Sequence, residues 1–276
     1  MQGGVDGLAH GVEDGDAFDL LATPSRGDTG DDLRAVVDGV AGLASAGGAT
    51  VTVLAADTSV FEDTSRVMSE IGAMPRPLLG VVHAAGVIDD SFVAELDLDR
   101  IERVFAPKVI AAWNLHELTK DAPLDFFVCF SSVAACLGSV GQAHYAAANA
   151  GLDALAAYRR AQGLPCLSIG WGAIGDVGYL RRNPDVARYL QQTGVSPIPV
   201  RDALAAFGKL LGRECSRIVF ANINWSLLVR ANPTLLSNAR TASFGVSHSD
   251  DGKSGQVLRA RLLGMAAAAR APIVTS

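Results

Sequence analysis

Three polar side chains stand in the otherwise small and apolar stretch SSVAACLGSVGQAHYAAANA, residues 131–150. Ser132 precedes Tyr145 by thirteen residues, and Asn149 follows Tyr145 by four. The spacing of four places Tyr145 and Asn149 on one face of a helix. A tyrosine phenol can give a proton to a carbonyl oxygen, and a serine hydroxyl can hydrogen-bond the same oxygen. The three residues therefore suit the reduction of a carbonyl group, with a nicotinamide as the hydride source.

A tyrosine that gives up its proton needs a nearby cation to stabilise the phenolate. Lys108 is the candidate, 37 residues before Tyr145 and inside the apolar segment FAPKVIAAWNLHEL, residues 105–118. From the residues alone, a second interpretation stays open. Lys108 can be a surface lysine whose stem lies along apolar neighbours, while Tyr145 is a half-buried core residue. Ser132 and Asn149 can then be a strand-end residue and a solvent-facing residue.

Apolar, β-branched runs predict strands that are buried on both faces of a parallel sheet. The strands are expected at residues 49–57, 78–87, 124–132, 165–172 and 217–225, with a further short strand at 18–27. The helices are expected at residues 31–47, 64–72, 97–120 and 144–163. This alternation predicts an α/β fold with a doubly wound parallel sheet of the Rossmann type. Ligands of such sheets lie beyond the carboxyl ends of the strands, where Ser132 is expected.

Composition excludes several classes of protein. The 276 residues are 49% hydrophobic and carry a net charge of −6, with no basic stripe that favours nucleic acid. The four cysteines are widely spaced, which favours reduced core residues in a cytoplasmic protein over disulfides or a metal site. The first residues do not resemble a signal peptide, and no apolar run reaches the length of a membrane span.

The chain resembles the ketoreductase domain of modular type I polyketide synthases, which belongs to the short-chain dehydrogenase/reductase superfamily. The resemblance rests on five segments in order: GVVHAAGVIDD, VFAPKVIAAWNLHEL, LDFFVCFSS, GQAHYAAANAGLDALAAYR and SIGWGAIGDVG. It extends from about Ser25 to Trp225. It implies an NADPH-dependent reduction of a β-ketoacyl thioester to a β-hydroxyacyl thioester, on a substrate bound to an acyl carrier protein.

The resemblance also assigns roles to the four polar residues. It implies that Tyr145 donates the proton and that Ser132 holds the ketone oxygen. Lys108 would lower the pKa of the tyrosine and contact the ribose, and Asn149 would complete a catalytic tetrad. Many short-chain dehydrogenases carry lysine at the position of Asn149, and its exchange with a lysine from the APK segment is typical of polyketide ketoreductases.

Cofactor and stereocontrol residues follow from the same resemblance. The cofactor-binding residues would be Ser25 and Arg26 at the 2′-phosphate, Asp57 at the adenine, and Ala84, Ala85 and Gly86 below the ribose. Ile88, Asp89 and Asp90 stand where one stereochemical class carries Leu-Asp-Asp, with isoleucine in place of leucine, and Gln142 stands where the opposite class has tryptophan. These residues imply a D-configured hydroxyl group. Residues 181–199 would form a mobile lid over the substrate. Taken alone, Arg26 is an ordinary solvated turn arginine.

The amino-terminal part departs from the family. The family's first strand and its glycine-rich turn are represented only by GGVDGLAH, residues 3–10, in which Asp6 and Ala9 replace glycines. Backbone glycines at this turn approach the pyrophosphate, so we expect an N-terminally truncated domain with impaired NADPH binding. The missing strand would come from a partner chain, or the sheet would expose two edges.

We therefore expect a degenerate remnant at residues 1–17, a ketoreductase-like domain at 18–230, a linker at 231–256 and a short helix at 257–276 that leads towards an absent carrier domain. The leading hypothesis is a β-ketoacyl reductase that works with other polyketide synthase modules. The alternative is a catalytically silent fragment that serves as an interaction module or is completed by a partner chain. A stand-alone dehydrogenase acting on a free carbonyl compound is a third possibility.

Overall fold

The strands of the protein are short and almost all parallel. The computed structural model describes residues 19–22, 50–176, 178–232 and 235. The strands are β1 (Asp19–Ala22), β2 (Thr50–Val53), β3 (Gly80–His83), β4 (Phe126–Ser132), β5 (Leu167–Trp171), β6 (Val195–Ser196), β7 (Arg217–Phe220) and β8 (Asn222–Ile223).

The strands form one larger parallel sheet and two strand pairs. The larger sheet has the order β3-β4-β5-β7, and all its pairings are parallel. β1 and β2 form a separate parallel pair, and in the described part of the chain β3 pairs only with β4. The expected α/β fold with a parallel sheet is confirmed. The expected strand at 217–225 is shorter, because the chain leaves β7 after Phe220 and pairs β8 antiparallel with β6.

The helices alternate with these strands. They are α2 (Phe61–Gly72), the 3₁₀ helix η1 (Val93–Glu95), α3 (Leu98–Phe105), the π-helix η2 (Ala106–Ile110), α4 (Ala111–Thr119), α5 (Ala134–Leu137), α6 (Ala143–Ala161), α7 (Gly178–Arg182), α8 (Pro184–Gln192), α9 (Val200–Leu210) and α10 (Trp225–Ala231). The single helix expected at 97–120 is thus interrupted by a π turn. The Asp97 side chain accepts a hydrogen bond from Arg100 N and caps the start of α3.

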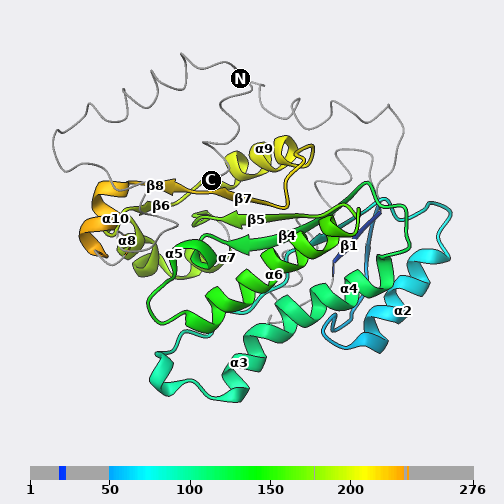
Figure 1. Cartoon of the computed structure of the whole chain (residues 1–276), viewed down its shortest axis with the longest axis horizontal. Helices are drawn as coiled ribbons and strands as arrows, with labels where there is room; N and C mark the ends of the chain where they lie inside the picture. Colours follow the sequence, from blue (N-terminus) through cyan, green and yellow to red (C-terminus); the bar gives the residue numbers. More distant parts are fainter. Residues whose placement is uncertain (1–18, 23–49, 177, 233–234, 236–276) are drawn as a thin grey trace, which may run out of the picture. The chain divides into compact units, whose positions relative to one another are not determined.

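The core lies between the sheet and the helices α4 and α6, which run side by side, with α6 packed on β4 (Figure 1). Phe127 and Cys129 of β4 are fully buried against Leu152 and Leu155 of α6. Successive strand residues point to opposite faces, and the Phe130 ring accordingly contacts Phe207 of α9 at 5.7 Å between centroids. Helices therefore cover both faces of the sheet, as expected for a doubly wound fold.

The chain divides into two compact units. In the described residues, the first contains the parallel strands, α2 to α6 and α9, and the second contains residues 173–198 and those after 220. The segment expected to be a lid, residues 181–199, belongs to the second unit except for its last residue, and it forms the end of α7, α8 and β6. Its role stays a prediction.

Several expectations fall outside the described residues. They are the glycine-rich remnant, the helix at 31–47, Ser25 and Arg26, and the carboxyl-terminal helix. The domain boundaries stay predictions for the same reason. Among the described helices, none is long and apolar enough to span a bilayer.

Candidate active site

The four candidate catalytic residues come from three elements that contact one another. Lys108 lies in the π turn η2, Ser132 ends β4, and Tyr145 and Asn149 are one turn apart on α6. α6 packs on both β4 and η2. The turn before α6 contains Gly138 and Gly141, both with positive φ angles near 70°, a conformation that glycine adopts without strain. This turn lets the chain reverse between Ser132 and Tyr145.

The Lys108 side chain is enclosed, with only 4% of its surface exposed. Its Nζ donates a hydrogen bond to Phe130 O at 3.1 Å and lies 5.5 Å from the centre of the Tyr145 ring. A Cβ atom at Gly86 would come within 2.8 Å of Lys108 Cε, so glycine is needed there for the lysine to pass. Burial lowers the pKa of Lys108 to about 8. The interpretation of Lys108 as a surface lysine is therefore wrong.

His83, the last residue of β3, holds the backbone of the lysine turn. Its Nε2 hydrogen-bonds Lys108 O at 2.9 Å, and the imidazole is buried. Burial, and next the charge of Lys108, lower the pKa of His83 to about 4, so the ring is neutral at physiological pH. A neutral ring that donates from Nε2 is the tautomer that fits this contact. His83 therefore fixes the turn without adding a second charge beside Lys108.

Ser132 and Asn149 both act on the Tyr145 phenol. Burial raises the pKa of Tyr145, and the Asn149 and Ser132 side chains act in the opposite direction. Ser132 Oγ accepts a hydrogen bond from Ala134 N at 3.1 Å. Asn149 is fully buried; its Nδ2 donates to Tyr145 O at 2.8 Å, while its Oδ1 has no partner in the described residues. Asn149 does not face solvent, contrary to one reading of the sequence.

The candidate stereocontrol residues lie on the loop after β3 and at the start of α6. Gln142 Nε2 donates to Asp90 Oδ1 at 2.8 Å, which joins these two residues directly. The carboxylate of Asp89 has different partners, Arg100 and Arg103 of α3. Asp90 is exposed, whereas the Asp89 side chain is only 15% exposed. The structure thus pairs Asp90 with Gln142 and turns the Asp89 side chain towards α3.

Four of the candidate cofactor residues are described, and they follow the carboxyl ends of β2 and β3. Ala84, Ala85 and Gly86 come directly after β3. Asp57 lies four residues beyond the end of β2, so it does not end the strand as expected. Asp57 Oδ1 accepts hydrogen bonds from Ser59 N and Ser59 Oγ, which fixes the carboxylate in a turn. Ser25 and Arg26 lie outside the described residues.

Comparison with known proteins identifies the family. A family model described as "KR domain" matches residues 9–176. The chain belongs to the KR domain family. Erythronolide synthase EryA2 of Saccharopolyspora erythraea is 41% identical over 201 residues, which are 73% of this KR chain and 5% of that protein. Mycoketide-CoA synthase of Mycobacterium tuberculosis is 44% identical over 180 residues, 64% of this chain and 4% of that protein.

Solved structures of ketoreductases share the fold. A structure titled "Structure of A1-type ketoreductase" matches with a TM-score of 0.70 and 36% identity, over 77% of this chain and 44% of that one. A C2-type ketoreductase from a modular polyketide synthase matches with a TM-score of 0.67 and 29% identity. The match covers 84% of this chain and 48% of that one. The KR chain therefore spans about half of these solved chains. These two proteins are ketoreductases of different types, so the similarity does not decide the stereochemical class of this chain.

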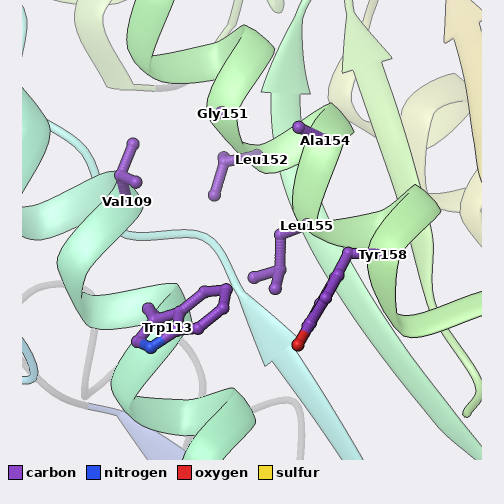
Figure 2. Close-up of a pocket in the computed structure, with 7 residues that line it drawn as sticks. All are labelled: Val109, Trp113, Gly151, Leu152, Ala154, Leu155 and Tyr158. Atoms are coloured by element: carbon purple, nitrogen blue, oxygen red, sulfur yellow. The ribbon is translucent and has the colours of Figure 1, made fainter. Parts of the chain in front are cut away.

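An apolar hollow of about 300 Å³ lies apart from the four candidate residues, between the η2–α4 segment and α6. Figure 2 shows Trp113 and Tyr158 projecting into it from the two sides. Both side chains are more than two-fifths exposed. Its lining includes none of the four candidate residues and consists of Val109, Trp113, Gly151, Leu152, Ala154, Leu155 and Tyr158.

Sequence reasoning missed three groups of the site: His83, the arginine pair of α3, and His144. His144 Nε2 lies 2.6 Å from Asp89 O, so it joins α6 to the loop after β3. The sequence does contain a weak signal for the arginines, because Arg100 and Arg103 are spaced i,i+3 and share a helix face. The sequence contains no such signal for His83, because this residue looks like any other residue of a buried strand.

Proposed function

We propose that this chain is the catalytic half of a ketoreductase domain that reduces a β-ketoacyl thioester to a β-hydroxyacyl thioester with NADPH. The observation that carries the proposal is the convergence of Lys108, Ser132 and Asn149 on Tyr145. Family membership supports carbonyl reduction as the chemistry. The substrate would be bound to an acyl carrier protein and passed on within a polyketide synthase, as the synthase relatives support.

The proton follows a short route in this proposal. Ser132 and the Tyr145 phenol hydrogen-bond the ketone oxygen, and Tyr145 gives it a proton as the carbonyl carbon becomes an alcohol carbon. Burial raises the pKa of Tyr145, so the phenol is protonated and ready to donate at neutral pH. The Lys108 ammonium, 5.5 Å from the ring centre, stabilises the phenolate that remains. Solvent then returns the proton to Tyr145.

The residues present fit a nicotinamide cofactor. Lys108 Nζ carries three hydrogens and donates to one oxygen in the described residues, Phe130 O. Its remaining hydrogens suit the hydroxyl groups of a ribose. Asp57 and the Ala84–Gly86 segment would hold the adenosine part, with Ser25 and Arg26 at the 2′-phosphate. When bound, NADPH would supply the hydride that the carbonyl carbon receives.

A second candidate function rests on the division of the parallel strands. In the described residues β1 pairs only with β2, and β3 leaves one edge unpaired beside the half-exposed Leu79 and Val82. An unpaired edge with apolar neighbours favours the addition of a strand. The chain would then act as a module that is completed by a strand from a partner chain and is silent on its own.

Two measurements on the full chain test these functions. The first is NADPH oxidation with an N-acetylcysteamine β-ketoacyl thioester, with NADH for comparison. Tyr145→Phe is expected to lower kcat by about 100-fold or more, whereas Tyr158→Phe, a matched change at a half-exposed tyrosine, leaves kcat unchanged. Equal rates for Tyr145→Phe and wild type would refute the proposal.

The second measurement is calorimetric titration with NADPH. Binding that exceeds the binding of NADH supports an intact cofactor site. A folded chain that neither binds NADPH nor turns over favours the silent module instead.

A further inference from the structure

The loop after β3 is tied to the start of α6 by three hydrogen bonds. Ser91 N donates to Gly141 O at 2.8 Å, Gln142 Nε2 donates to Asp90 Oδ1 at 2.8 Å, and His144 Nε2 lies 2.6 Å from Asp89 O. All three end within four residues of Tyr145. Any movement of the loop therefore changes the surroundings of the residue that donates the proton.

The Asp89 carboxylate anchors this loop to α3. Arg100 Nη1 donates to Asp89 Oδ1 at 3.0 Å, and Arg103 Nη1 donates to the other oxygen, Oδ2. Arg100 Nη1 also donates to Asp90 O at 3.2 Å. Exposed ion pairs usually contribute little to stability. This carboxylate is only 15% exposed and has a guanidinium on each oxygen, so α3 holds both of its oxygens.

The two neighbouring aspartates consequently do different things. The Asp89 side chain is occupied by α3 and is not available to a substrate. The Asp90 carboxylate is exposed and held by Gln142, and its charge reaches the Tyr145 phenol, where it adds to the effect of burial in raising the pKa. Of the two aspartates, therefore, only Asp90 has an exposed carboxylate that is joined to the start of α6.

We propose that Arg100 and Arg103 are positioning residues that act through Asp89 to hold the Asp90–Gln142 pair beside Tyr145. Because the family resemblance assigns product configuration to this loop, the arginines would then act on the configuration through the pair. The inference rests on the proposed reduction. It places the control of product configuration partly on α3, which does not contact the reacting atoms.

The test compares three forms of the full chain: wild type, the double variant Arg100→Gln/Arg103→Gln, and Arg66→Gln. Arg66 is the matched control, because it forms an i,i+4 ion pair with Glu70 on α2. The first readout is hydrogen exchange at the Ser91 amide without substrate. Exchange is expected to be at least about tenfold faster in the double variant and unchanged in Arg66→Gln, because loss of the anchor opens the loop locally.

The second readout is the ratio of the two epimeric alcohols formed from a prochiral N-acetylcysteamine β-ketoacyl thioester. The minor epimer is expected to rise at least about fivefold in the double variant. Asp89→Asn keeps the side-chain shape and removes the charge, so it serves as a second variant if the double variant does not fold. It is expected to change both readouts in the same direction.

The possible results distinguish a failure of the proposed positioning role from a failure of the proposed reduction. Unchanged exchange at Ser91 would overturn the anchoring role of the arginines, whether or not the chain is active. Faster exchange with an unchanged epimer ratio would overturn the control of configuration. A wild-type chain that fails to reduce the thioester would overturn the proposed function, and the exchange measurement would still decide the anchoring.

Discussion

Replacing Lys108 by methionine is expected to stabilise the fold while it removes activity. Methionine has a similar length and no charge, so it fills the same enclosed space beside Gly86. Burial lowers the pKa of Lys108 from 10.5 to about 8, and each pKa unit corresponds to about 1.4 kcal/mol. The buried ammonium therefore lowers the free energy of unfolding at pH 7 by about 3 kcal/mol.

The stabilisation gained by removing the ammonium is reduced, because Lys108→Met also loses one hydrogen bond. The bond from Nζ to Phe130 O contributes a net stabilisation of about 1 kcal/mol. The Lys108→Met variant should therefore be about 2 kcal/mol more stable than wild type at pH 7. Without the ammonium no positive charge stabilises the Tyr145 phenolate, so kcat should fall by about 100-fold or more.

The dependence of the free energy of unfolding on pH tests the role of the buried Lys108 ammonium more sharply. Between about pH 8 and pH 10.5 the unfolded chain keeps a proton on Lys108 that the folded chain has lost. The unfolded state then binds more protons, so the free energy of unfolding of wild type rises with pH through this window. The advantage of Lys108→Met should shrink over the same range and reverse at its upper end.

Urea denaturation at pH 7 and pH 9.5 measures this difference directly. Lys209→Met is the control, because Lys209 is an exposed lysine of α9 and its replacement should change stability by less than about 0.5 kcal/mol. The reasoning would be refuted if Lys108→Met were less stable than wild type at pH 7. A stability difference that does not vary with pH would refute it equally.

Three further predictions concern the surroundings of Lys108 and the core. Gly86→Ala should lower kcat by about 10- to 100-fold, because the new Cβ would lie 2.8 Å from Lys108 Cε; Gly72→Ala, with no atom within 4 Å of the added Cβ, should leave kcat unchanged. His83 is buried neutral with a pKa of about 4, so the free energy of unfolding should fall as the pH drops from 6.5 to about 4; this loss, seen by urea denaturation, should be absent in His83→Asn. Leu152→Ala, at a fully buried position, should lower the free energy of unfolding by about 2–5 kcal/mol in the same assay.

The sequence predicted the strands of the parallel sheet and the long helices between them because both have strong periodic signals. The runs at 124–132 and 165–172 became β4 and β5, and every residue of β5 is buried. The helix of Tyr145 and Asn149 was also expected within one residue of its start and two of its end. Spacing alone was enough to place these two residues on one face.

Details that depend on tertiary contacts were not predictable from the sequence. No local signal in the sequence distinguishes a π turn from an α-helix around Lys108. The turn lies between α3, which packs on α6, and α4, which packs on both α2 and α6. The adjacent aspartates 89 and 90 look equivalent in the sequence, yet only Asp89 meets the two arginines of α3. The catalytic and cofactor roles carried by resemblance stay predictions that the proposed measurements test.

The π turn has a consequence for how the lysine segment can change in evolution. A π turn holds one residue more than an α turn, so the helices on its two sides are out of phase by about 100° relative to an unbroken helix. Val104 before the turn and Ala111 and Ala112 after it are all fully buried. The helix on each side of the turn therefore buries its own face in the orientation that the π turn sets. Deleting one residue between Ala106 and Ile110 would restore a regular helix but rotate one of these buried faces towards solvent. Single-residue deletions should therefore be rarer here among relatives than in the loops on either side.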